Sequence, residues 1–151
     1  MAEDRMIVCL ACNALNRVPE GKALTAAKCG RCSQALATPH PADITNEQMQ
    51  LLEKKDTGAF VVDLWAPWCG PCRMMAPHYE ATAQHLQSDV RFYKINTDQH
   101  PDAAIRLNIR GVPTLIAWKG GRELAKQAGA PGGAALERWV RSLFGLAPSP
   151  N

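Results

Sequence analysis

The six cysteines of this sequence are its residues best suited to chemistry, and they fall into three Cys-x-x-Cys pairs. The pairs are Cys9/Cys12, Cys29/Cys32 and Cys69/Cys72. Sixteen residues separate the first pair from the second, a spacing typical of a four-cysteine zinc site. The third pair follows an apolar segment and precedes a helical pattern, which indicates redox chemistry rather than metal binding.

The first two pairs lie in a segment poor in large apolar residues, without a sustained helical or strand period. Such a segment lacks the core to fold alone, and metal binding can supply about 10–16 kcal/mol. We therefore expect Cys9, Cys12, Cys29 and Cys32 to bind one Zn²⁺ per chain. Gly30 is expected to allow the sharp turn of one cysteine knuckle, and Asn13 a left-handed backbone at the other.

Two disulfides, or iron in place of zinc, are the alternatives for these four cysteines. Four protein ligands leave no open coordination position, so a bound zinc is expected to be structural, with redox sensing or partner docking as alternatives. His40, eight residues beyond Cys32, is interpreted as a linker residue rather than a ligand.

Cys69 and Cys72 stand where an apolar strand, Phe60–Trp65, is expected to pass into a helix. The backbone N–H groups and dipole at a helix N-terminus stabilise a thiolate, which is the form of cysteine that attacks disulfides. Cys72, one helical turn further on, can attack the resulting mixed disulfide and release the substrate. The pair is therefore predicted to form a redox-active disulfide, with Pro71 placed harmlessly in the first helical turn.

Asp63 interrupts the otherwise apolar strand and is therefore predicted to be buried. Burial raises the pKa of a carboxyl group, so that it can exchange protons near neutral pH. A purely structural acid is the alternative, but Asp63 lies only six residues before Cys69. We expect it to assist the thiol chemistry.

Alternating strand and helix signals from about residue 42 onward must position these groups. Strand–helix–strand followed by a hairpin and a helix predicts an α/β fold with a mixed central sheet flanked by helices. The predicted helices are 46–55, 70–87, 101–107 and one around 136–144, and the predicted strands are 60–65, 90–96, 114–118 and 123–127.

Pro39 and Pro41 favour an extended linker, so we expect a zinc module at residues 1–41 and a separable α/β domain at 42–151.

Lys and Arg exceed Asp and Glu by only two in residues 1–40 and by one in residues 41–151. Four zinc-bound thiolates would cancel most of that surplus, so we expect no nucleic-acid partner. No apolar run reaches membrane-span length and the first residues do not resemble a signal peptide. We therefore expect a cytoplasmic protein that does not bind a membrane, and we also expect it to be a monomer.

Beyond these local signals, the sequence from residue 42 to near residue 146 closely resembles the thioredoxin family. The resemblance is carried by Phe60–Cys72, Lys94–Asp98, Arg110–Thr114, Lys119–Gly121 and Gly129–Ala130. The four-cysteine N-terminus is similar to that of the zinc-containing thioredoxin-2 class of bacteria. The resemblance implies a thioredoxin fold with an N-terminal zinc ribbon, and a protein disulfide reductase that thioredoxin reductase returns to the reduced state.

The resemblance also implies a role for particular residues. Cys69 would be the exposed nucleophile and Cys72 the resolving thiol, with Asp63 and Lys94 as a buried pair that moves its proton. Pro113 would follow a cis peptide bond, and Pro67 stands where many thioredoxins carry an acid. The substrate-binding surface would comprise Trp68, Gly70, Pro71, Gly111, Val112, Pro113, Gly129 and Ala130.

A redox-linked binding module is the alternative function. In that case the zinc module would dock a partner, and the Cys69/Cys72 pair would only gate the docking. Turnover of a disulfide substrate separates the two functions, because a docking module should not turn over.

Overall fold

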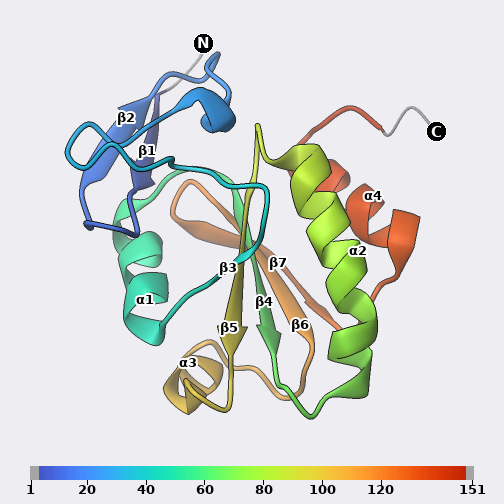
Figure 1. The fold of residues 1–151 in the computed structure, drawn as a ribbon. Helices are drawn as coiled ribbons and strands as arrows, with labels where there is room; N and C mark the ends of the chain where they lie inside the picture. The colour runs from blue at the N-terminus through green and yellow to red at the C-terminus, as the bar shows by residue number, and fades with distance from the viewer. Residues whose placement is uncertain (1–3, 149–151) are drawn as a thin grey trace.

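The computed structural model describes residues 4–148 and places a small N-terminal module on a larger α/β domain (Figure 1). Within this module, residues 4–37, β1 (Arg5–Val8) and β2 (Leu15–Val18) pair antiparallel, and a 3-10 turn, Leu24–Ala26, follows. These two strands were not predicted from the sequence. Each strand has only four residues, too few to give a recognisable alternation of apolar and polar side chains.

A five-stranded mixed sheet forms the centre of the larger domain. Its strand order is β3-β5-β4-β6-β7, in which β3, β5 and β4 run parallel and the other pairs antiparallel. The strands are β3 (Ala42–Asp43), β4 (Phe60–Trp65), β5 (Arg91–Asn96), β6 (Thr114–Lys119) and β7 (Arg122–Ala128). The mixed sheet confirms the predicted α/β class.

Four helices cover the two faces of the sheet (Figure 1). They are α1 (Asn46–Lys55), α2 (Gly70–Leu86), α3 (Pro101–Arg106) and α4 (Gly133–Leu143). Alternate side chains of β4 enter two separate cores: Val61 packs with residues of α2 and α4, whereas Phe60 and Leu64 pack with residues of α1 and α3. The period of two in a strand buried on both faces produces this division.

The predicted helices and strands of the larger domain all appear, with ends displaced by at most a few residues. Only the two-residue strand β3 was missed, because two residues carry no periodicity. α2 continues through Pro77. No helix within residues 4–148 combines the length and apolarity needed to cross a membrane.

The N-terminal module is packed firmly against the larger domain, at the end of the sheet where β4 begins (Figure 1). Val8 of β1 is buried in the core formed with α1 and α3. The backbone N–H of Val8 donates to Asp56 Oδ2 at 2.9 Å, and Arg91 makes two contacts of 2.6 Å with the Asp56 carboxylate. This ion pair lies within the larger domain and is almost completely buried, and the hydrogen bond from Val8 attaches the N-terminal module to it.

Candidate active site and metal centre

Cys69 and Cys72 form a disulfide at the junction of β4 and α2. Cys69 is the residue that caps the N-terminus of α2, and its sulfur accepts a hydrogen bond from the backbone N–H of Cys72 at 3.2 Å. Pro71 occupies the first turn of the helix, as predicted. An anionic Cys69 sulfur would therefore face the positive end of the helix dipole and at least one N–H donor.

The cysteine expected to be exposed is instead almost covered in this disulfide state. Cys69 and Cys72 are each 4% exposed, because Ala66 and the partly buried Trp65 and Val112 pack around them. Cys69 Sγ lies 3.7 Å from the carbonyl oxygen of Val112. The prediction that Cys69 is the open residue of the pair was therefore wrong for this state.

Asp63 lies in the core beneath α2, as predicted, with 2% of its surface exposed. Burial raises the pKa of its carboxyl group from 3.8 to about 7, despite the opposing effect of the Lys94 charge. Lys94 is the neighbour of Asp63 across the β4–β5 pairing. Among residues 4–148 no ion pair joins them, and the Lys94 ammonium lies 4.6 Å from the centre of the Trp65 ring. Lys94 is only partly buried, so the expected buried pair is adjacent in the sheet but is neither fully buried nor joined by a salt bridge among the described residues.

The residues implied as a substrate-binding surface lie in the segments around the disulfide. Trp68 is 68% exposed, and its indole N–H donates to Asp98 at 3.1 Å. The Val112–Pro113 peptide bond is cis, as the resemblance implied. The backbone N–H of Gly129 donates to the Pro113 carbonyl, which places the Gly129 segment beside it. Gly70 is partly buried, and Pro71, Gly111, Gly129 and Ala130 are exposed.

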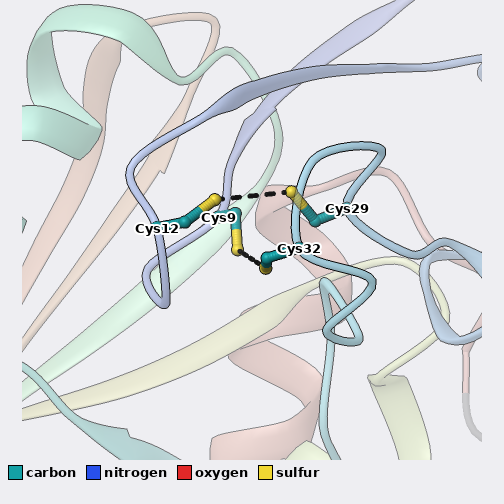
Figure 2. Close-up of side chains that lie close together, drawn as sticks. All are labelled: Cys9, Cys12, Cys29 and Cys32. Carbon is teal, nitrogen blue, oxygen red and sulfur yellow. Dashed lines mark hydrogen bonds between the residues drawn. The ribbon is translucent and has the colours of Figure 1, made fainter.

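Four thiols converge in the N-terminal module (Figure 2). The sulfurs of Cys9, Cys12, Cys29 and Cys32 all lie within 4.8 Å of one another. The closest approaches, both 3.6 Å, join Cys9 to Cys32 and Cys12 to Cys29, and so run between the two knuckles rather than within them (Figure 2). None of the four is disulfide-bonded in this structure.

This arrangement fits a tetrahedral zinc ion. Zn–S bonds of about 2.3 Å place the sulfurs of a tetrahedral site about 3.8 Å apart, close to the 3.6 Å observed. The two knuckles have the same backbone pattern: Asn13 donates to the Cys9 carbonyl and Ser33 to the Cys29 carbonyl. Asn13 has φ 67° as predicted, but in the second knuckle Ser33, with φ 68°, is left-handed rather than Gly30.

Two family models match the chain. The model described as Thioredoxin matches residues 40–142, more than half of the sequence. The chain belongs to the thioredoxin family. The model described as Thioredoxin 2, N-terminal, a zinc ribbon, matches residues 8–34 and includes all four clustered cysteines. The protein is therefore a thiol–disulfide oxidoreductase with Cys69 and Cys72 as its redox pair, and its N-terminal module is a four-cysteine zinc ribbon.

Known thioredoxins match over most of this chain. Thioredoxin C-3 of Corynebacterium nephridii is 37% identical over 89% of the chain and 92% of the relative's length. The chloroplastic thioredoxin M4 of Arabidopsis thaliana is 35% identical over 89% of this chain and 68% of the length of M4. The crystal structure of Malassezia sympodialis thioredoxin superposes on this chain with a TM-score of 0.62 and 27% sequence identity. The match covers 72% of this chain and 94% of the Malassezia chain.

Two side-chain contacts of the folded protein were not predicted from the sequence. Asp56 and Arg91 are 35 residues apart and meet only because β4 and β5 are paired. His40, interpreted as a linker residue, contacts Glu80 of α2 at 2.5 Å. No sequence pattern joins either pair, since each depends on the tertiary fold.

Proposed function

We propose that this thioredoxin is a general protein disulfide reductase that thioredoxin reductase, with NADPH, returns to the dithiol state. The placement of the Cys69/Cys72 pair at the N-terminus of α2 carries this proposal. The helix start stabilises a thiolate at Cys69 and holds the second thiol one turn away. That is the arrangement two successive thiol–disulfide exchanges require.

In the first exchange, the Cys69 thiolate attacks one sulfur of a substrate disulfide. A mixed disulfide forms between Cys69 and the substrate, and the other substrate sulfur leaves as a thiolate. In the second exchange, Cys72 loses its proton and attacks the Cys69 sulfur. The Cys69–Cys72 disulfide forms, and the substrate leaves with both sulfurs reduced. Two electrons pass from the cysteine pair to the substrate.

We assign the proton of Cys72 to Asp63. Its pKa of about 7 suits a group that must accept and return a proton near neutral pH. Lys94 supports this role by favouring the ionised carboxylate through its charge. The two together set the proton affinity that the resolving step requires.

Substrates would dock as extended segments across an apolar surface beside the disulfide. Exposed Trp68 supplies the largest apolar area, and the Val112 carbonyl lies next to the Cys69 sulfur. An extended substrate backbone can pair there as an added strand. Further contacts would come from the implied surface residues Gly70, Pro71, Gly111, Gly129 and Ala130, whereas the side chain of Pro113 is buried.

We propose one Zn²⁺ per chain, held by the four clustered cysteines. The fit of the sulfur spacing to a tetrahedral ion supports this stoichiometry. With four protein ligands the bound ion would stabilise the module, leaving no position for a catalytic water. Both thiol functions require a reducing environment, so we place the protein in the cytoplasm.

Reduction of insulin disulfides by catalytic amounts of the protein, with thioredoxin reductase and NADPH, tests the reductase function. We expect multiple turnovers for the wild type and none for Cys69→Ser. Absence of insulin reduction by the wild type, although the reductase demonstrably reduces the Cys69–Cys72 disulfide, would instead support the binding-module function.

A further inference from the structure

A cavity of about 120 Å³ lies beside Lys94, between α2 and the segment that joins the two parts of the chain. This volume accommodates several water molecules. The cavity is lined by His40, Pro41, Ala76, Tyr79, Glu80 and Lys94. It therefore brings solvent close to the residue paired with Asp63 in the sheet.

The cavity also adjoins the helix face that carries the resolving cysteine. Ala76 and Glu80 follow Cys72 at intervals of four residues, so the three side chains share one stripe of α2. Tyr79, which forms another part of the wall, is close enough to Asp63 for the carboxylate charge to raise the pKa of its hydroxyl, although burial raises it more. The cavity and Cys72 thus lie along the same helix, and Asp63 of β4 is close to Tyr79 in the cavity wall.

Residues 38–43, which we call the strap, form one side of this cavity through His40 and Pro41. Figure 1 shows the chain running from the N-terminal module across toward α2 before it turns back into β3. The Thr38 hydroxyl donates to the His40 carbonyl at 2.9 Å, and the His40 imidazole contacts the Glu80 carboxylate at 2.5 Å. At its far end, Asp43 pairs in register with Lys94. The strap, expected from its prolines to be an extended linker, is therefore also held against α2 and β5.

Two charges on neighbouring strands act on Asp63. Lys94 on β5 lowers its pKa, whereas Asp43 on β3 and the burial of the carboxyl itself raise it, burial being the largest effect. Glu80 and His40 are not among the groups that shift it directly. Any influence of His40 and Glu80 on Asp63 therefore acts through hydration, which depends on how tightly the cavity is closed, or through the position of Asp43 at the far end of the strap.

Asp63 Oδ1 has no hydrogen-bond partner among the described residues, although it is buried. A carboxyl group that gives up and takes back a proton needs an exchange route to solvent. The cavity reaches Lys94 and Tyr79, two neighbours of Asp63, and the exposed His40 and Glu80 side chains form another part of its wall.

We propose that His40 and Glu80 are positioning residues for the resolving step: they close the strap over the cavity and thereby control the hydration and proton exchange of Asp63. This inference rests on the proposed function, in which the proton of the Cys72 thiol passes to the Asp63 carboxylate. From there the proton passes to water in the cavity. No electrons move along this route, because the electron pairs are exchanged only among the sulfurs.

Two substitutions in the full chain test the proposal, His40→Ala and Glu80→Gln. Both release the strap, so water should enter and the Asp63 pKa, measured by carboxyl ¹³C NMR on the oxidised protein, should fall by about half a unit. Full burial can raise the pKa of a carboxyl group by about 3–5, and partial hydration should reverse a fraction of that rise. The midpoint of the pH profile for resolution of a Cys69 mixed disulfide should fall by the same amount.

His85→Gln is the matched control, because His85 also lies on α2 and contacts a glutamate, Glu137, at 2.7 Å. It faces the groove between α2 and α4, away from Lys94. We expect no change in the Asp63 pKa for this variant.

An Asp63 pKa unchanged in both strap variants, or shifted equally in His85→Gln, would overturn the proposal. The carboxyl titration requires no reductase or substrate. A failure of the proposed reductase function would therefore be seen separately, as absence of turnover in the wild type. Glu80→Gln keeps the side-chain volume, so a folded variant is available if His40→Ala perturbs the strap further.

Discussion

Replacing Asp63 by Asn removes a carboxylate that is costly to ionise in the folded protein. Asp63 is 2% exposed and burial raises its pKa from 3.8 to about 7. Asn keeps the size of the side chain and resembles the protonated acid. We therefore expect Asp63→Asn to fold normally and to be more stable than the wild type when the wild-type carboxyl must ionise.

The size of this stability effect follows from the rise in the Asp63 pKa from 3.8 in the unfolded chain to about 7 in the folded protein. Between pH 3.8 and 7 the folded protein holds a proton on Asp63 that the unfolded chain has released, so wild-type stability falls as pH rises through this window. The loss is complete above pH 7. It amounts to about 1 kcal/mol at pH 4.5 and about 4 kcal/mol at pH 9. Asp63→Asn should escape this loss.

Urea unfolding of the oxidised proteins at pH 4.5 and pH 9 measures this difference. The stability advantage of Asp63→Asn should grow by about 3 kcal/mol between the two pH values. Asp102→Asn, at an exposed acid in the first turn of α3, is the control and should change stability by less than about 0.5 kcal/mol at either pH. An advantage of the same size at both pH values would refute the account of Asp63 as a buried, titrating acid.

Two further predictions concern the contact between the module and the larger domain. Asp56→Asn should lower the free energy of unfolding in urea by about 3–5 kcal/mol, because it leaves the buried Arg91 charge without its partner. The control, Glu53→Gln at the more open Arg106 pair, should lower it by no more than about 1 kcal/mol. Equal losses would show that burial does not decide the effect. A chain beginning at Ala42 should still react with a small disulfide. Its free energy of unfolding should be lower by at least the roughly 1.5–3 kcal/mol that the burial of Val8 contributes. A truncated protein that is folded but inactive would place catalytic residues in the N-terminal module.

The sequence allowed the larger domain and its active centre to be predicted because their signals are local. The apolar run around Asp63 indicated burial, and the strand-to-helix junction indicated where Cys69 and Cys72 lie. Cysteine spacing indicated the four-thiol cluster for the same reason, since each knuckle is a short continuous turn.

Contacts made only by the folded chain could not be predicted. The Asp56–Arg91 and His40–Glu80 pairs join residues 35 and 40 positions apart, with no periodic pattern between them. The two prolines beside His40 indicated an extended segment, but not that it would lie against α2. The coverage of Cys69 also depends on Val112, which is distant in sequence and close only through the β6 end of the sheet.

The order of the two thiols is the central claim, and trapping the mixed disulfide tests it most directly. Reduced Cys72→Ser is mixed with a protein disulfide substrate, and the linked product is digested without reduction and analysed by mass spectrometry. We predict a stable adduct joined through Cys69, with no adduct for Cys69→Ser under the same conditions. A stable adduct of Cys69→Ser joined through Cys72, with none for Cys72→Ser, would contradict the assignment of nucleophile and resolving thiol.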